Sequence, residues 1–417
     1  MRLTPRLSIC VPSRNRQFYL AATVSGMLRH MREDVELVIA DNSDDPAPIA
    51  DFVASLPAGA PITYLPPADR VLSMQDNWER TVSAARGDWI TVIGDDDHLD
   101  PDLAGMIGRI EALSPGVEAI SWPLPHFEWP HPSKRSYNFS LWLRPMILRV
   151  ERQTAFGSAF RWDNASIGPT GTYSIYHSAI SRGLAQRVRA TFGGNYFGHP
   201  TVDYDFAFKV AALCKSFIHV TRPFSIMGVC QESNSASIGD PDRMEAICRT
   251  FYAELGRNMD EDPWMADFPF PAALGVTPAI AQVNAWLAHQ YGLPKLPGWD
   301  ENFVAACQLS CDRIRNRAHF DRLVEGYRRG FSAYQGGRYL ESFNPQFGGD
   351  PAYEVYTGVK GDKLYIDQSI GHAETPADFF EIIESILGSI DTVPLELRRG
   401  DLSLELIPTA PPLQKTG

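Results

Sequence analysis

Short apolar runs alternate with amphipathic stretches over roughly residues 5–125 of the chain. The runs have the length of strands, and in the stretches between them apolar residues recur at helical spacing. The predicted strands are 7–11, 36–40, 62–65, 89–93 and 119–122, and the segments between them are 18–28, 46–55, 74–85 and 101–113. Strands that are apolar throughout are typical of a sheet covered on both faces. The pattern therefore predicts an α/β fold class, with a mainly parallel sheet and helices on both of its faces.

Beyond residue 122 the alternation loosens into a stretch rich in aromatic residues and proline. A second α/β segment follows, with a predicted helix at 205–215 and a predicted strand at 216–220. Residues 240–335 then have helical patterns. We therefore predict a first domain over 1–238, a helical region over 239–335, and a small α+β region with a frayed tail over 336–417.

The last part of the chain carries two local signals. Two aromatic-rich runs flank Lys360-Gly361 within residues 353–368, which predicts a hairpin. Thr375 followed by Pro376 is typical of the start of a helix, so we predict a helix over 375–387.

Acidic residues outnumber basic ones, with 50 Asp and Glu against 38 Lys and Arg, a net charge of -12 and a pI of about 5.3. Non-specific nucleic-acid binding needs a basic surface, so we expect no nucleic-acid partner. The apolar run Leu7–Val11 is too short for a secretory signal, and no uninterrupted run of 18 apolar residues occurs. We therefore expect neither a signal peptide nor a transmembrane span.

Six cysteines are scattered along the chain without a disulfide framework. Cys307 and Cys311 are four residues apart, which is helical spacing, so we expect a pair facing the core rather than a zinc site. This use of cysteine favours a reducing, cytoplasmic location.

The segment WITVIGDDDHLD (89–100) places Asp95, Asp96 and Asp97 directly after a predicted strand. Their like charges cost stability unless a cation or a set of donors offsets them. Ligands of open α/β sheets bind at the carboxyl ends of strands, and paired carboxylates suit Mg²⁺ or Mn²⁺. We therefore predict a metal and diphosphate site, where alternation puts Asp95 and Asp97 on one side. The alternative is helix capping or solvation, although Asp100 already fills the predicted cap position before Pro101.

Two other predicted strands also end in polar residues. Asp41 follows the second strand and precedes Asn42 and Ser43, so it can accept from a base N–H or a ribose hydroxyl. An ordinary turn is the alternative, because Asp, Asn and Ser are the residues that turns prefer. The first strand ends in VPSRNR (11–16), whose arginines can meet phosphate, although surface exposure is their usual role.

In order and spacing, these motifs resemble those of the family 2 glycosyltransferases, which have the GT-A fold. VPSRNR looks like the family's Pro-Thr-Tyr-Asn-Arg, and Asp41-Asn42-Ser43-Asp44 is similar to its Asp-Asp-Gly-Ser. DNWERTVSAARGDWI (76–90) looks like the stretch before the family's metal motif, and GDDD (94–97) takes the place of its Asp-x-Asp signature. The resemblance covers roughly residues 5–125. It implies transfer of a sugar from a nucleotide diphosphate sugar to an acceptor hydroxyl, with inversion at the anomeric carbon.

The resemblance also implies which residues form the site. The implied nucleotide-binding residues are Pro12, Ser13, Arg14, Arg16, Asp41, Arg70, Asp95 and Asp96. Asp97, with Asp95, would hold Mn²⁺ or Mg²⁺ on the diphosphate. Many members of the family have Asp at the position of Gly94, so a register in which Asp96 and Asp97 are the working pair stays open.

An acceptor hydroxyl is a poor nucleophile, so the reaction needs a general base. The family places an acidic pair, often Glu-Asp, about a hundred residues after the metal motif, where a helix begins. HPTVDYDFAFKVAAL (199–213) is similar: Asp203 matches the second acid, Val202 replaces the first, and Asp205 is the nearby alternative. A simple helix cap at Asp203 is the structural alternative.

The implied partners are a UDP-, GDP- or dTDP-sugar donor and a carbohydrate or glycoconjugate acceptor. The resemblance implies synthesis of a surface polysaccharide or glycoconjugate, in the cytoplasm or at the inner face of the membrane, and leaves peripheral membrane contact and oligomerisation open. Because Val202 replaces an acid, a non-catalytic module that binds a nucleotide sugar or a partner is the alternative. A phosphatase of the haloacid dehalogenase type would need Asp-x-Asp after the first strand, where VPSRN stands.

Overall fold

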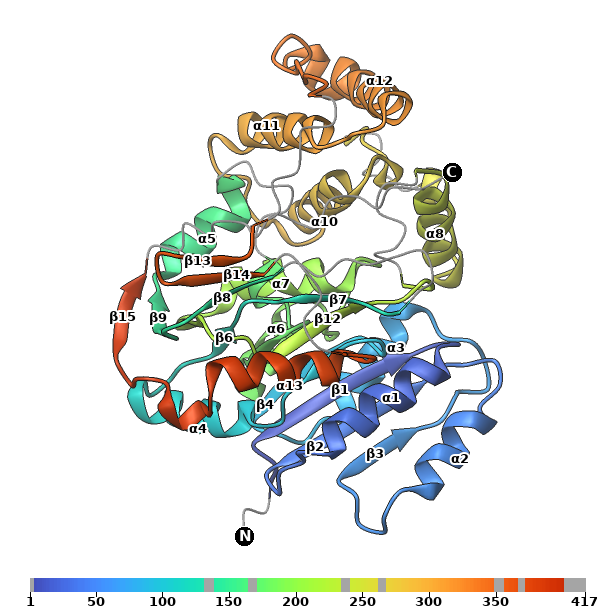
Figure 1. The fold of residues 1–417 in the computed structure, drawn as a ribbon. Helices are drawn as coiled ribbons and strands as arrows, with labels where there is room; N and C mark the ends of the chain where they lie inside the picture. Colours follow the sequence, from blue (N-terminus) through green and yellow to red (C-terminus); the bar gives the residue numbers. More distant parts are fainter. Residues whose placement is uncertain are drawn as a thin grey trace.

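The computed structural model describes residues 4–130, 139–163, 171–233, 241–261, 268–348, 356–366 and 372–400. In these residues, nine strands form the largest sheet, in the order β15-β9-β11-β6-β10-β4-β1-β2-β3 (Figure 1). The nine strands are β1 (Leu7–Ser13), β2 (Val35–Asp41), β3 (Ile62–Leu65), β4 (Trp89–Val92), β6 (Ala119–Ser121), β9 (Ile147–Val150), β10 (Ser178–Ser181), β11 (Phe217–Val220) and β15 (Leu397–Gly400). Five neighbouring pairs are parallel and three are antiparallel. The predicted α/β class with a mainly parallel sheet is therefore confirmed.

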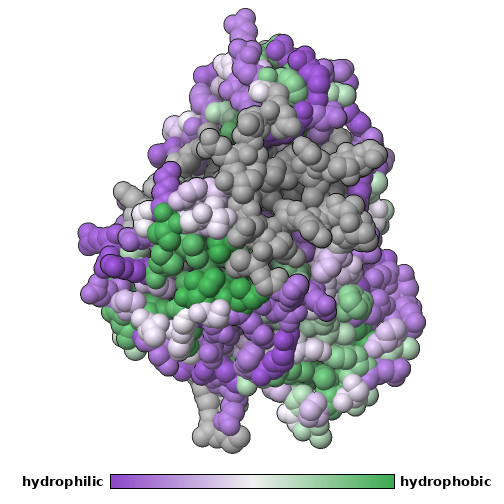
Figure 2. All heavy atoms as spheres, in the orientation of Figure 1, coloured by the Kyte–Doolittle hydropathy of each residue, from purple (hydrophilic) through white to green (hydrophobic). Residues whose placement is uncertain are grey.

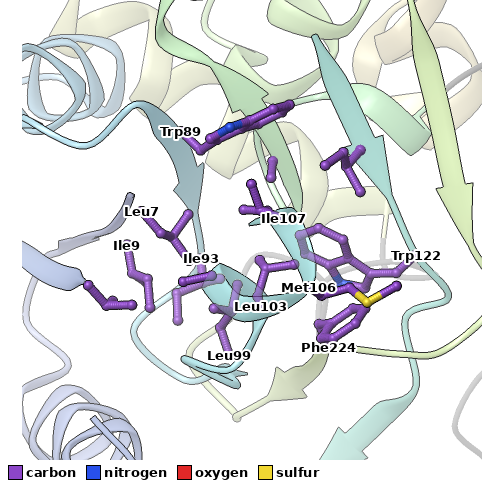
Figure 3. Close-up of a cluster of buried hydrophobic side chains, with 14 of the residues drawn as sticks. Leu7, Ile9, Trp89, Ile93, Leu99, Leu103, Met106, Ile107, Trp122 and Phe224 are labelled. Carbon is purple, nitrogen blue, oxygen red and sulfur yellow. The ribbon is translucent and has the colours of Figure 1, made fainter. Parts of the chain in front are cut away.

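Helices cover both faces of this sheet. The α-helices in the described residues are α1 (Gln17–Leu28), α2 (Ala47–Ser55), α3 (Met74–Ala84), α4 (Leu103–Leu113), α5 (Arg152–Arg161), α6 (Arg182–Thr191), α7 (Val202–Leu213), α8 (Pro241–Glu254), α10 (Val276–Tyr291), α11 (Trp299–Asp312), α12 (Arg317–Ala333) and α13 (Pro376–Leu387). Side chains of α1 and α4 pack on one face, and side chains of α3, α6 and α7 pack on the other. Figure 3 shows the first of these cores, where Leu7 and Ile9 of β1 lie near Leu103 and Ile107 of α4.

Alternation along β1 explains how one strand serves both cores. Leu7, Ile9 and Val11 belong to the core under α1 and α4, whereas Cys10 belongs to the core under α3 and α6. A strand with apolar residues on both faces must be buried on both, as the unbroken apolar runs predicted. All seven residues of β1 and of β2 are buried.

Two predicted helix starts are wrong: α7 begins at Val202, three residues before the predicted 205, and α4 begins later than predicted. Helix α4 begins at Leu103, two residues later than predicted, and Asp102 rather than Asp100 precedes it. Asp100 instead accepts the Asp102 N–H on its Oδ1 at 2.9 Å, so Pro101 and Asp102 form a turn before the helix. A carboxylate that bonds the backbone two residues on is typical of such turns.

Two small sheets flank the large one. One has the order β5 (His98–Leu99), β12 (Ser225–Val229), β7 (His126–Glu128), and the other has β13 (Gly358–Lys360), β14 (Lys363–Ile366), β8 (Phe139–Trp142). The predicted hairpin is confirmed, with its two-residue turn one position later, at Gly361-Asp362. The predicted cap of α13 is also confirmed, because Thr375 and Asp378 form a capping box.

The end of the described chain returns to the first part of the molecule. Helix α13 packs on β12 and α1, β14 pairs with β8, and β15 adds an edge strand beside β9 (Figure 1). Figure 2 shows apolar side chains gathered over the hairpin and α13, where Val359 and Leu143 are exposed.

Helices α10, α11 and α12 form a separate aromatic core with α5 and α7, stacked at the top of Figure 1. Cys307 and Cys311 are both fully buried in it, which confirms the predicted core-facing pair. Within the described ranges, no helix combines the length and the apolar character that crossing a membrane requires.

Candidate functional site

Three polar strand ends meet at one edge of the large sheet, which we call the carboxyl edge: the ends of β4, β1 and β2. These strands are neighbours and run parallel, and Ser13 lies opposite Asp41 in the register of β1 and β2. On the other side of β1, Ser13 Oγ donates to Asp95 Oδ2 at 2.6 Å. The predicted convergence of the three motifs is therefore what the fold produces, because parallel strands end at the same edge.

The turn Gly94–Asp97, which we call the acid loop, is held through its backbone carbonyls. Thr23 Oγ1 lies 2.9 Å from the carbonyl oxygen of Asp95 and 2.8 Å from that of Asp97. Trp129 Nε1 donates to the carbonyl oxygen of Asp96 at 2.8 Å. A Cβ added at Gly228 would lie 1.6 Å from the same oxygen, so β12 can pass the loop only with glycine there. The acid loop is thus fixed by α1, β12 and the segment after β7.

Asp97 is enclosed by donors. Its Oδ2 accepts from Gly94 N at 2.6 Å and from Tyr176 OH at 2.8 Å, and it lies 2.8 Å from His177 Nε2. Its Oδ1 accepts from Gly228 N at 2.7 Å, and the residue is 0% exposed. Burial alone would raise the pKa of Asp97, but the His177 imidazole and these hydrogen bonds together hold it below the ordinary carboxyl value.

A strained segment presents Tyr176 and His177 to Asp97. Ile175 has φ 64° and His177 has φ 52°, a left-handed backbone that β-branched and bulky residues rarely adopt. Backbone bonds to Val92 of β4 hold this segment in place, from Val92 N to Ile175 O and from His177 N to Val92 O. Sequence reasoning missed both side chains, because no motif or periodic pattern marks them. Strain of this kind clusters at functional sites.

Asp95 and Asp96 differ from Asp97 because each has one carboxylate oxygen that faces Arg16. Asp95 Oδ2 is taken by Ser13 and Asp96 Oδ2 accepts from Cys230 N at 3.1 Å, whereas both Oδ1 atoms point to Arg16. Arg16 Nη1 lies 2.9 Å from Asp95 Oδ1 and 3.5 Å from Asp96 Oδ1. Burial, followed by the charges of Asp97 and Asp95, raises the pKa of Asp96 to about 7. Burial also raises the pKa of Asp95.

The packing of the acid loop favours glycine at position 94 for a steric reason. A Cβ at this position would lie 2.8 Å from Asp97 Oδ2 and 3.0 Å from Asp96 Oδ1, closer than real Cβ contacts. A larger residue would therefore force the carboxylates of the acid loop apart. This explains why the chain carries glycine where many members of the resembled family carry aspartate.

Asp41 is fully buried at the end of β2 and holds one donor on each oxygen. Its Oδ1 accepts from Ser43 N at 2.9 Å, as in an ordinary Asx turn, and its Oδ2 accepts from Tyr64 OH at 3.2 Å. Burial and then the charge of Asp41 raise the pKa of Tyr64 to about 12. Each carboxylate oxygen can accept a further bond, so the predicted base contact stays a prediction.

The two other predicted arginines lie away from the acid loop. Arg14 forms an ion pair with Glu254 of α8. Arg70 is 68% exposed, with Asp76 at 3.5 Å. Pro12 is buried inside β1, directly before Ser13. Their roles toward a nucleotide stay predictions.

Asp203 and Asp205 begin α7 in different surroundings. Asp205 is fully buried, and its Oδ2 accepts from Lys209 Nζ at 2.7 Å and from Gly198 N at 2.7 Å. Asp203 is partly buried and has no ion pair among those the structure records for the described residues. Burial raises the pKa of Asp203 to about 6, although hydrogen bonds from backbone N–H groups oppose the shift. Asp203 is also close enough to Tyr176 for its charge to raise the pKa of that phenol, after burial and the acid loop.

Three potential metal ligands lie close together elsewhere. Asp100, Asp102 and Glu384 each offer an oxygen within 4.8 Å of the others, the one such group in the described ranges. Arginines already pair with two of them: Arg32 Nη1 lies 3.0 Å from Asp102 Oδ1, and the buried Arg222 lies 3.4 Å from Glu384 Oε1. Glu384 therefore links α13 to Arg222 by an ion pair, whereas the Arg32–Asp102 pair does not involve α13.

Comparison with known protein families identifies a family for the first part of the chain. Residues 8–181 match the family described as Glycosyl transferase family 2. No curated protein matches the chain. The motifs of the carboxyl edge, from Ser13 to Asp97, all fall inside the matched segment.

Two solved structures illustrate the more distant likenesses. S. aureus TarS 1-349 in complex with UDP-GlcNAc is 11% identical, with 87% of this chain and 99% of that chain covered and a TM-score of 0.42. The mannosyltransferase PcManGT from Pyrobaculum calidifontis, in complex with GDP-Man and Mn²⁺, is 16% identical, with 82% and 84% covered and a TM-score of 0.35. Likenesses this distant support no conclusion about a substrate.

The family match agrees with the architecture of the sheet and with the motifs at its carboxyl edge. It confirms the predicted family, its GT-A type of α/β fold and the predicted enzyme class. Over residues 8–181, the chain matches the family 2 glycosyltransferases, as the sequence motifs predict.

Proposed function

We propose that this protein transfers a sugar from a nucleotide diphosphate sugar to an acceptor hydroxyl, with inversion, and that the donor binds at the carboxyl edge. One observation carries the proposal. Asp95 and Asp96 each direct one oxygen, Oδ1, to the same cationic group, while Ser13 and Cys230 N hold their other oxygens. Two buried carboxylates aimed at one positive charge are suited to a cation that carries a diphosphate.

The carboxylate oxygens of the acid loop are suitable ligands for Mg²⁺ or Mn²⁺. Both are bound by oxygen ligands, and Mg²⁺ commonly uses one or two carboxylates together with substrate phosphates. The acid loop offers two carboxylate oxygens in this way, the Oδ1 atoms of Asp95 and Asp96 that face Arg16, because Asp97 is already engaged by four donors. We therefore favour Asp95 and Asp96 as the residues that would hold the cation, with Asp97 fixing the loop. When bound, the cation would neutralise the diphosphate as the leaving group.

Asp203 is the general base of this proposal. It lies at the start of α7, and its charge contributes to raising the pKa of Tyr176, which donates to Asp97 of the acid loop. A carboxylate with a pKa of about 6 is ionised at neutral pH and can take the proton of an acceptor hydroxyl as the new bond forms. Asp205 is a poorer candidate, because Lys209 and Gly198 N already engage its Oδ2. Attack from the side opposite the leaving group gives inversion.

The proposal is tested by calorimetric titration of the wild-type protein with UDP, GDP and dTDP, each with and without Mn²⁺. The first two are the nucleotides of the ligands held in the TarS and PcManGT structures. We expect one nucleotide to bind, and its affinity to rise with Mn²⁺. If no nucleotide binds under any metal condition, the donor site is refuted. If one binds but its sugar is transferred to no acceptor and released to no water, the non-catalytic alternative is favoured.

A further inference from the structure

Arg16 stands where a donor-bound cation would stand. Its Nη1 faces both Oδ1 atoms of Asp95 and Asp96, and its side chain is only 19% exposed. The other oxygens of the two carboxylates are turned toward Ser13 and Cys230 N. The oxygens that remain for a divalent cation are therefore those that the guanidinium already occupies.

The turn before α1 directs this arginine inward and its neighbour outward. Asn15 has φ 57°, which asparagine tolerates, and it is fixed to the end of β2 by Asn15 N to Ser43 Oγ at 2.9 Å and Asp44 N to Asn15 Oδ1 at 2.9 Å. On one side of Asn15, Arg14 reaches Glu254; on the other, Arg16 reaches the acid loop. Two arginines of one turn thus have different partners.

The charges of the acid loop explain why it needs a counter-cation. Asp95, Asp96 and Asp97 are almost completely buried, and His177 lies on the side of Asp97 only. Buried carboxylates without a counter-charge are costly, so Arg16 stabilises the acid loop while no metal is present. A divalent cation and a guanidinium repel each other, so a cation bound at these two oxygens weakens the hold of Arg16 on them.

We propose that Arg16 is a resident counter-cation that the donor's metal must displace, and that the diphosphate receives the displaced guanidinium. This inference rests on the donor site proposed above. It makes metal and nucleotide binding cooperative: metal alone must compete with Arg16, whereas metal with a diphosphate gives Arg16 a new anionic partner. By linkage, the gain that nucleotide confers on metal equals the gain that metal confers on nucleotide.

Titration of Mn²⁺ into the protein, with and without the nucleotide selected above, tests this. Arg16→Gln removes the competing charge, so we expect Mn²⁺ alone to bind more tightly than to wild type, by on the order of tenfold. The cooperative gain from nucleotide should shrink by a similar factor. Arg29→Gln is the control, because Arg29 pairs with Asp378 and Glu381 of α13 rather than with the acid loop; it should bind Mn²⁺ as wild type does, with and without nucleotide.

The outcomes separate the two proposals. If Arg16→Gln and wild type bind Mn²⁺ alone equally, or the variant binds it more weakly, the role of Arg16 is refuted while the donor site stands. If wild type binds no Mn²⁺ even with nucleotide, the donor site itself is refuted. Should the variant not fold, a crystal structure of the wild-type complex decides: Arg16 is expected to have left Asp95 Oδ1 for the diphosphate, and an intact Arg16–Asp95 pair beside the bound metal would overturn the inference.

Discussion

Asp96→Asn is expected to abolish metal-dependent binding of the nucleotide and to lower sugar transfer by about 10²- to 10³-fold. The substitution keeps the shape of the side chain and an acceptor for Cys230 N, but it removes the negative charge that Asp96 shares with Asp95 toward one cation. Calorimetry with nucleotide and Mn²⁺, followed by a product-release assay, measures both effects. The free energy of unfolding should change little, because Arg16 keeps its pair with Asp95.

Asp97→Asn is the informative comparison. An amide cannot accept all the donors that surround Asp97, so this variant should unfold at a lower temperature than Asp96→Asn. The opposite result would be a stable Asp97→Asn protein without metal-dependent binding, together with an Asp96→Asn protein that binds as wild type does. That result would make Asp95 and Asp97 the metal ligands.

Asp203→Asn should lower kcat by about 10²- to 10⁴-fold while leaving nucleotide binding unchanged, because only the proton acceptor is lost. In wild type, kcat should fall as the pH drops through about 6, since the carboxylate must be ionised to take a proton and its pKa is raised to about 6. Asp203→Asn should lose this acidic limb. Steady-state kinetics between pH 5 and 8 measure the profile.

Asp205→Asn serves as the control for this position. It leaves Lys209 buried without its charge partner, so it should destabilise the fold by about 3–5 kcal/mol. The folded fraction should retain the acidic limb of kcat. A lost limb in Asp205→Asn, with the limb intact in Asp203→Asn, would make Asp205 the base.

The strand ends could be predicted because their signals are local. Unbroken apolar runs marked β1, β2 and β4, and a polar residue after each run placed Ser13, Asp41 and the acid loop at one edge. Parallel neighbours bring such ends together whatever the details of packing.

The different roles of Asp95, Asp96 and Asp97 could not be predicted, because they depend on contacts with residues distant in the sequence. Alternation along a strand pairs Asp95 with Asp97, but the chain turns at Gly94, and β12 and the segment before β10 then enclose Asp97. Arg16 was predicted to meet phosphate, and its pairing with Asp95 and Asp96 arises only once α1 packs against the acid loop and β5. Tyr176 and His177 depend on a strained backbone that no sequence pattern signals.

In the proposed donor site, the Oδ1 atoms of Asp95 and Asp96 hold the cation of a nucleotide diphosphate. An anomalous difference map of crystals grown with Mn²⁺ and the bound nucleotide tests it most directly. We expect a manganese peak within coordination distance of both Oδ1 atoms and of a diphosphate oxygen. A peak at Asp97, or at Asp100, Asp102 and Glu384, with the nucleotide bound elsewhere, would contradict it.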